Sequence, residues 1–139
     1  MENPELIIYT DGASRGNPGE AGIGVVVVTA AGEPVAEIAD YLGRATNNVA
    51  EYTALQVGLE KARELGARRI EIRSDSELMV RQVNGQYRVN NEGLLPLFRE
   101  VAALLRRFEQ VTVRHIPRER NRRADALANQ GIDNKLTNR

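Results

Sequence analysis

The order of strand-like and helix-like segments is the feature of this sequence that most constrains its fold. Residues 47–65 place Tyr52, Leu55, Leu59 and Ala62 at steps of three and four, which predicts an amphipathic helix. Short runs rich in β-branched residues lie on both sides of this helix. In order, we predict strands at 6–11, 21–29 and 35–42, a helix at 47–65, a strand at 69–75, helices at 76–83 and 94–108, a strand at 111–116 and a helix at 121–132.

This order predicts an α/β fold with a five-stranded mixed sheet flanked by helices. The first three strands would form an antiparallel meander, and right-handed crossovers would return the last two strands parallel to the first. Residues 13–20 contain Gly16, Asn17, Pro18 and Gly19, and we predict a turn-rich loop there. We expect a single domain over residues 1–139, with a frayed tail at 133–139.

Composition excludes several classes of function. The 19 Lys and Arg residues balance 19 Asp and Glu residues, so the chain lacks the basic excess of a general nucleic-acid binder. The absence of Cys excludes disulfides, thiol catalysis and Cys-ligated zinc, and it suits the cytoplasm. We expect no membrane span, because the longest weakly polar run, 21–32, is too short. We expect no secretory signal, because the N-terminal Met-Glu-Asn-Pro has no basic region and no apolar run. Without an exposed apolar stripe, we expect a monomer.

Two acids stand at the ends of predicted strands. Asp11 ends the first strand, directly before Gly12, and Asp75 ends the fourth. Ligands of open α/β sheets bind outside the carboxyl ends of parallel strands, so the two carboxylates could meet there if their strands are neighbours. For either residue alone, an Asx turn is an equally simple interpretation.

Two further acids lie on the apolar side of predicted helices. Steps of four and eleven from Glu51 reach Leu55 and Ala62, and steps of three and seven from Asp125 reach Ala128 and Ile132. Unpaired carboxylates are rarely placed on such a stripe. The alternative for both is an acid that interacts with the helix dipole near an N-terminus.

Four carboxylates in one place would repel one another unless cations lay between them. Two divalent ions would neutralise their charge, and such pairs catalyse in-line displacement at phosphodiesters. Oxygen ligands favour Mg²⁺ or Mn²⁺ over zinc.

The motifs around these acids resemble those of type 1 ribonuclease H, in the family's order, from about residue 5 to residue 132. They are Thr10-Asp-Gly-Ala-Ser-Arg-Gly-Asn-Pro-Gly19, Thr46-Asn-Asn-Val-Ala-Glu51, Ser74-Asp-Ser-Glu77 and Asn121-Arg-Arg-Ala-Asp-Ala-Leu-Ala128. The resemblance implies a ribonuclease H-like fold and two-metal hydrolysis of the RNA strand of RNA/DNA hybrids, leaving 5′-phosphate and 3′-hydroxyl ends. It implies that Asp11, Glu51, Asp75 and Asp125 are the metal-binding catalytic acids, with Asp11 bridging both ions.

The resemblance also makes His115 a candidate for proton handling or product release, because it lies ten positions before Asp125. By itself a lone histidine at a strand end indicates no role. Its context, Arg114-His-Ile-Pro-Arg118, differs from the Gly-rich context of the family's enterobacterial-type members.

Eight residues match the family's substrate contacts. Three would lie near the RNA strand, two would contact the minor groove, and three would hold a phosphate of the DNA strand. These are respectively Gly12, Ser14 and Asn17; Asn47 and Asn48; and Arg44, Thr46 and Asn90. Turn chemistry explains Asn17 equally well, and Asn47 could instead be a helix N-cap.

Residues 84–93 lack the tryptophans and the basic charge that many members carry in a protrusion. The chain therefore resembles the shorter branch, and the basic run at 114–123 is either a second binding surface or a solvated connector. Two other interpretations stay open. One is a non-catalytic hybrid-binding module of the same fold, and the other is a related nuclease acting on DNA, such as a resolvase or integrase.

Overall fold

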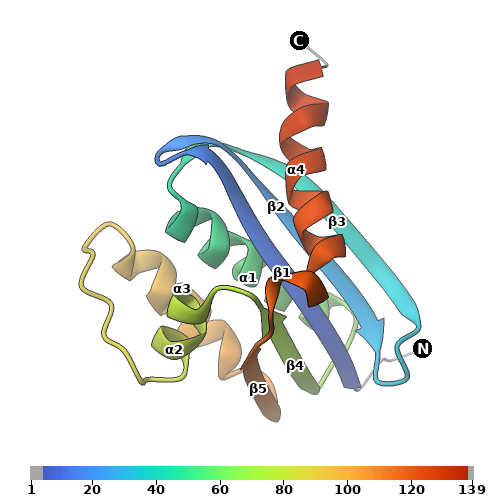
Figure 1. Ribbon diagram of the computed structural model, residues 1–139. Coiled ribbons are helices and arrows are strands. Elements are labelled where there is room, and N and C mark those ends of the chain that lie inside the picture. The colour runs from blue at the N-terminus through green and yellow to red at the C-terminus, as the bar shows by residue number, and fades with distance from the viewer. Residues whose placement is uncertain (1–4, 138–139) are drawn as a thin grey trace.

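The computed structural model describes residues 5–137, and its five strands form one mixed sheet in the order β3-β2-β1-β4-β5 (Figure 1). Strand β1 pairs antiparallel with β2 and parallel with β4, and β4 pairs parallel with β5. The predicted meander, crossovers and fold class are confirmed. The elements are β1 Glu5–Gly16, β2 Gly19–Thr29, β3 Pro34–Ala45, α1 Asn47–Glu64, β4 Arg69–Ser74, α2 Glu77–Val83, α3 Leu95–Leu105, β5 Gln110–His115, a 3-10 turn at Arg118–Arg120, and α4 Arg122–Thr137.

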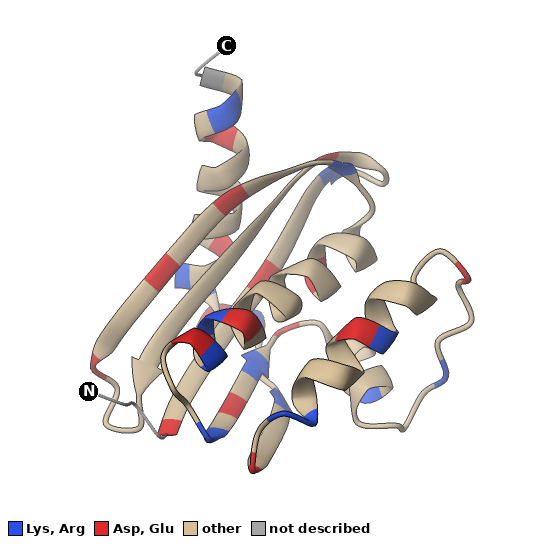
Figure 2. Ribbon diagram, turned by 180° about the vertical axis from the view of Figure 1, so that it is seen from behind, with Lys and Arg blue, Asp and Glu red and all other residues tan. Residues whose placement is uncertain are grey.

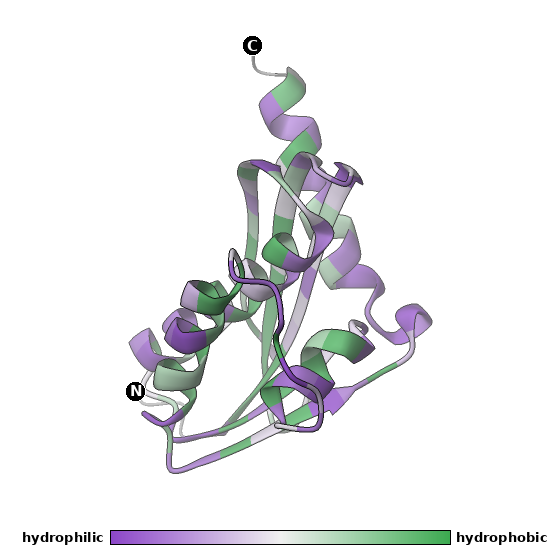
Figure 3. Cartoon of the chain, turned by 90° about the vertical axis from the view of Figure 1, so that its left-hand side faces the viewer, coloured by the Kyte–Doolittle hydropathy of each residue, from purple (hydrophilic) through white to green (hydrophobic). Residues whose placement is uncertain are grey.

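The sheet lies between two helical layers. Helix α1 packs on one face against β1 and β2, with α3 beside it, and α4 covers β1, β2 and β3 on the other face (Figure 1). Leu6 and Ile8 alternate along β1 and join Leu55 and Leu59 of α1 in the main core. Figure 3 shows hydrophobic segments where the helices face the sheet, and a mostly hydrophilic loop between α2 and α3.

Charged residues of both signs are interspersed over the strands and helices (Figure 2). This distribution agrees with the balanced composition. Among residues 5–137, no helix is long and apolar enough to cross a membrane.

The segment predicted as a loop at 13–20 is instead a hairpin. β1 continues to Gly16, β2 begins at Gly19, and their pairing runs unbroken from Asp11 opposite Gly24 to Gly16 opposite Gly19. Only Asn17 and Pro18 form the turn. The prediction failed because the same turn residues suit either a long loop or a tight hairpin, and pairing across strands decides between them.

The prediction of a frayed tail from residue 133 is wrong for residues 133–137, which continue α4. Arg15 of β1 forms an ion pair with Asp133 at 2.7 Å, and Lys135 stacks on the Tyr41 ring at 5.8 Å. These two contacts hold the last turns of α4 against the sheet, which the local sequence does not reveal. Residues 138–139 lie outside the described part of the chain.

The N-terminus of α1 is capped by Thr46, whose hydroxyl accepts a hydrogen bond from the backbone N–H of Val49 at 3.2 Å. Asn47 is the first helical residue, so the alternative that Asn47 is the cap is wrong. At the other end of α1, Gly66 follows the capping residue Leu65 and has a positive φ of 80°.

Candidate active site

An open cavity of about 410 Å³ lies at the end of the sheet where β4 stops and β1 runs on into its hairpin. Ligands of open α/β sheets bind at this end, outside the carboxyl ends of the parallel strands. All four predicted acids line it. The lining residues are Asp11, Gly12, Ala13, Ser14, Arg15, Asn47, Glu51, Asp75, Arg118, Asp125 and Asn129.

Close packing of α1 on β1 brings Glu51 to Asp11. A Cβ on Gly12 would lie 2.2 Å from the backbone carbon of Ala50, so only glycine permits this approach. The backbone N–H of Gly12 donates a hydrogen bond to Oε1 of Glu51 at 2.8 Å. Glycine at position 12 therefore sets the position of the Glu51 carboxylate, although the sequence suggested only a substrate contact for it.

Strand pairing brings Asp75 to the same place. Ser74, the last residue of β4, pairs with Thr10, so the next residue along each strand carries a carboxylate. One oxygen from each of Asp11, Glu51 and Asp75 lies within 4.8 Å of the others. The Asp11 side chain is only 5% exposed, so the cluster is deep enough to lose part of its hydration.

The fourth acid, Asp125, lies in the first turn of α4 and reaches the cavity from the opposite side of the sheet. Asn121, four residues before Asp125, is buried, and its Nδ2 donates a hydrogen bond to the backbone oxygen of Thr10 at 2.9 Å. The Asn121 backbone oxygen accepts from the N–H of Asp125 at 3.1 Å, as expected where a helix begins. Asn121 thus joins α4 to β1 directly beside the acids.

Burial and mutual repulsion raise the pKa values of Asp11, Glu51 and Asp75. Burial, together with the charges of Glu51 and Asp75, raises the pKa of Asp11 to about 9. Burial also raises the pKa of Glu51 to about 8, although the hydrogen bond from Gly12 opposes the shift. Burial raises the pKa of Asp75, while Asn121 and the charge of Arg118 act against the rise.

These groups fit a divalent cation. Within residues 5–137, no Lys or Arg forms an ion pair with any of the four acids. Oxygen atoms from three carboxylates converge in a cavity open to solvent, which is the donor set that Mg²⁺ and Mn²⁺ prefer. A bound cation would offset the mutual repulsion that, after burial, contributes to the raised pKa values of Asp11 and Glu51.

Of the eight predicted substrate contacts, the structure places Gly12, Ser14 and Asn47 in the lining of the cavity. Asn17 lies in the hairpin turn, where its Oδ1 accepts from the backbone N–H of Asn47 at 3.2 Å. The hydroxyl of Ser14 donates to the backbone oxygen of Ala45 at 2.7 Å. The hairpin is thereby joined to the start of α1.

The other predicted contacts lie outside that lining. Arg44 is exposed near the end of β3, Thr46 serves as the α1 cap, and Asn48 is exposed in the first turn of α1. Asn90 is exposed in the loop between α2 and α3. None of the five cavities described for residues 5–137 is lined by Arg44, Thr46 or Asn90.

His115 is the last residue of β5 and is exposed. It pairs with Ser74, one residue before Asp75, but it does not line the acidic cavity. The structure therefore places it near the carboxyl ends of the strands and apart from the four acids.

Sequence reasoning missed three polar residues of the cavity, Arg15, Arg118 and Asn129. Arg118 was visible only as part of a basic run. A polar residue four positions after Asp125 on the same helix face was the available signal for Asn129. Arg15 gave no signal, because it lay in the segment predicted as a loop.

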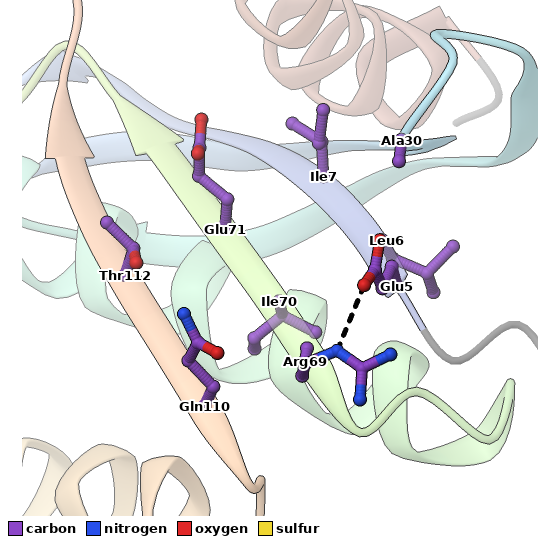
Figure 4. Close-up of a pocket in the computed structure, with 9 residues that line it drawn as sticks. All are labelled: Glu5, Leu6, Ile7, Ala30, Arg69, Ile70, Glu71, Gln110 and Thr112. Carbon is purple, nitrogen blue, oxygen red and sulfur yellow. Dashed lines mark hydrogen bonds and ion pairs between the residues drawn. The ribbon is translucent and has the colours of Figure 1, made fainter.

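A second cavity, of about 270 Å³, lies at the opposite end of β1 and β4 (Figure 4). Its carboxylates have cationic partners: Glu5 accepts from Arg69 at 3.0 Å, and Glu71 accepts from Arg73 at 2.5 Å. Figure 4 shows Ile7, Glu71 and Thr112 on neighbouring strands of this face. No carboxylate cluster for a metal was found there among the described residues.

Comparison with known proteins agrees with the motifs and the geometry. A family model described as reverse transcriptase-like matches residues 9–131. The chain is 47% identical to ribonuclease HI of Halobacterium salinarum over 125 residues, which are 90% of this chain and 63% of that protein. The chain belongs to the ribonuclease HI family. It is also 45% identical, over 93% of its length, to a bifunctional protein of Mycobacterium tuberculosis, of which it spans 36%.

Solved structures of this ribonuclease HI family superpose closely. RNase H1 from Halobacterium salinarum matches with a TM-score of 0.91 and 45% identity, over 94% of this chain and 98% of that one. LC11-RNase H1, solved in complex with an RNA/DNA hybrid, matches with a TM-score of 0.90 and 46% identity, over 94% and 99%. The fold assignment therefore rests on nearly the whole chain.

Proposed function

We propose that this protein is a metal-dependent endoribonuclease that hydrolyses the RNA strand of RNA/DNA hybrids. The observation that carries the proposal is the convergence of Asp11, Glu51 and Asp75 within 4.8 Å, beside Asp125, with no ion pair to a Lys or Arg among residues 5–137. The hybrid-bound structure of LC11-RNase H1 supports the choice of substrate.

In this proposal the four acids hold two divalent cations, Mg²⁺ or Mn²⁺, and Asp11 contacts both. Bound divalent cations supply electrophilic assistance at a phosphodiester and a nucleophilic water. The carboxylates fix where the cations bind, and the buried position of Asp11 limits the water that competes with the substrate. The products would carry 5′-phosphate and 3′-hydroxyl ends.

The hairpin and the start of α1 are proposed to seat the hybrid. Ser14, Asn17 and Asn47 lie at or next to the cavity and offer polar atoms to sugar hydroxyls, which distinguish RNA from DNA. Gly12 would contact the RNA strand beside them, and Asn48 would contact the minor groove. Arg44, Thr46 and Asn90 would contact a phosphate of the DNA strand.

His115, exposed at the end of β5, is proposed to assist proton handling or product release rather than to bind metal. We further propose that the protein acts as a monomer. Its lack of Cys suits a location in the cytoplasm.

The test is cleavage of a labelled RNA/DNA hybrid with Mg²⁺, with Mn²⁺ and with EDTA, alongside duplex DNA and duplex RNA. We expect metal-dependent cutting of the hybrid's RNA strand alone. A folded protein that binds the hybrid but cuts nothing with either metal would be a binding module, and cutting of duplex DNA would indicate a DNA nuclease.

A further inference from the structure

Three polar residues follow one another at intervals of four along a single face of α4: Asp125, Asn129 and Asp133. Residues so spaced lie one above the other on a helix surface. Arg15, near the end of β1, lies across this face. Its guanidinium donates to Oδ1 of Asn129 at 3.2 Å and forms an ion pair with Asp133 at 2.7 Å.

The amide of Asn129 joins this contact to the active site. Its Nδ2 donates to the backbone oxygen of Asp125 at 3.1 Å and approaches the Asp125 carboxylate oxygen Oδ1 at 3.4 Å. An arginine can only donate and a carboxylate can only accept, so the two partners together fix which end of the amide faces each. Asn129 therefore has one orientation, set from the β1 side by Arg15.

Asp125 needs such support more than the other acids do. Asp11, Glu51 and Asp75 form the close group within 4.8 Å, and Asp125 is not part of it. Apart from its neighbour Asp11, its carboxylate has one hydrogen-bond partner among the described side chains, the Asn129 amide. The repulsion among four carboxylates would otherwise turn Asp125 outward into the open cavity.

We propose that Arg15 and Asn129 are positioning residues, which hold the Asp125 carboxylate toward the cation site from the side of α4. The inference rests on the metal-dependent activity proposed above. Neither residue supplies a proton or a metal ligand. Their contribution is the orientation of a metal ligand, and loss of such outer contacts typically lowers metal affinity or activity about 10- to 100-fold.

The test compares Asn129→Ala, Arg15→Ala and the double variant with Gln130→Ala, which removes an exposed amide from the same helix. Calorimetric titration with Mn²⁺ measures metal affinity without any turnover. Single-turnover cleavage of the hybrid and hybrid binding in EDTA separate the chemical step from substrate affinity. Thermal unfolding checks that each variant is folded.

For Asn129→Ala we expect Mn²⁺ affinity and the cleavage rate to fall by about tenfold, with hybrid affinity within about twofold of wild type. Arg15→Ala should show the same pattern, and the double variant should be little worse than either single one, because both act through one amide. Gln130→Ala should match wild type.

The isosteric variant Asn129→Asp separates positioning from packing. It keeps the acceptor for Arg15 but removes the donor to Asp125, so the rate should fall while the melting temperature is retained.

Two results would overturn the inference. One is unchanged Mn²⁺ affinity and cleavage in a folded Asn129→Ala protein. The other is a loss confined to hybrid affinity, which would make Arg15 a direct substrate contact. If wild type itself cuts no hybrid, the proposed function fails, and the Mn²⁺ titrations still decide whether Asn129 supports the metal site.

Discussion

The two ends of the β1–β4 strand pair carry similar numbers of carboxylates but differ in whether these carboxylates form ion pairs. At the amino end, the Glu5 carboxylate lies 3.0 Å from the Arg69 guanidinium, and farther along β4 the Glu71 carboxylate lies 2.5 Å from the Arg73 guanidinium. At the carboxyl end, Asp11 and Asp75 face each other and Glu51, and no described Lys or Arg pairs with them. The first group of carboxylates is neutralised by arginines of the protein, whereas the negative charge at the carboxyl end is available to a bound cation.

The difference shows what separates a structural ion pair from a binding site. Exposed pairs such as Glu5–Arg69 contribute little to folding, because water already screens both charges. The buried acids reduce the stability of the metal-free protein, since their pKa values are raised. An arrangement that costs stability in isolation is typical of a site completed by a ligand.

The largest expected effect comes from removing the Asp11 carboxylate, and removal of Glu5 at the other end of the strand is its control. Asp11→Asn should lower hybrid cleavage by about a hundredfold or more, the loss typical of one electrostatic catalytic group. Glu5→Gln removes a carboxylate from the other end of the same strand and should leave cleavage unchanged. Cleavage rates at saturating Mg²⁺, with hybrid binding measured in EDTA, check both. Wild-type turnover by Asp11→Asn would contradict the assignment.

The glycine next to Asp11 should matter more than a glycine in a loop. Gly12→Ala would place its Cβ 2.2 Å from the Ala50 backbone and push α1 away from β1, at a cost of about 1–3 kcal/mol. Cleavage should fall with it, because Glu51 would move. Gly93→Ala, whose Cβ would meet only the Asn91 side chain at 3.2 Å, is the control. Urea unfolding measures both variants, and equal losses would refute the role of close packing.

Metal-free stability should depend on pH through Asp11. Its pKa is about 9 in the folded protein and about 4 when unfolded, so the native state binds more protons between these values and stability falls as pH rises through this range. Asp11→Asn removes that cost. In EDTA the free energy of unfolding of the variant should match that of wild type near pH 4 and exceed it increasingly as the pH rises, by several kcal/mol near pH 8.5.

Thermal unfolding at several pH values measures this difference. Added Mg²⁺ is the control, because it should stabilise wild type more than the variant and so reverse the order. If the stability difference between the variant and wild type does not grow with pH, burial does not raise the pKa of Asp11.

The smallest effect is expected at the amino end of the strand pair, where Glu5 forms an ion pair with Arg69. The Glu5–Arg69 pair is about half exposed, so Arg69→Ala should change the free energy of unfolding by less than about 1 kcal/mol and leave cleavage unchanged. Urea unfolding at low and high salt is the measurement. A loss of several kcal/mol would mean that the two ends of the strand pair are more alike than their contacts indicate.

The helices and strands could largely be predicted because their signals are local. Tyr52, Leu55 and Leu59 repeat with the period of a helix, and α1 forms where that repeat predicts it. The residues proposed to carry the chemistry were also visible, since Asp11 and Asp75 follow predicted strands or end them. Resemblance to the family named the same four acids that the cavity brings together.

What the sequence by itself determined is therefore the order of the elements, the mixed sheet and the identity of the acids. Only the tertiary structure decided that residues 13–16 pair with β2, that α4 continues to Thr137, and that Arg15 meets Asn129. The reason is the range of the interactions. Periodicity is set by residues three or four positions apart, whereas Arg15 and Asn129 are separated by 114 positions and meet only once strand order and helix packing are fixed.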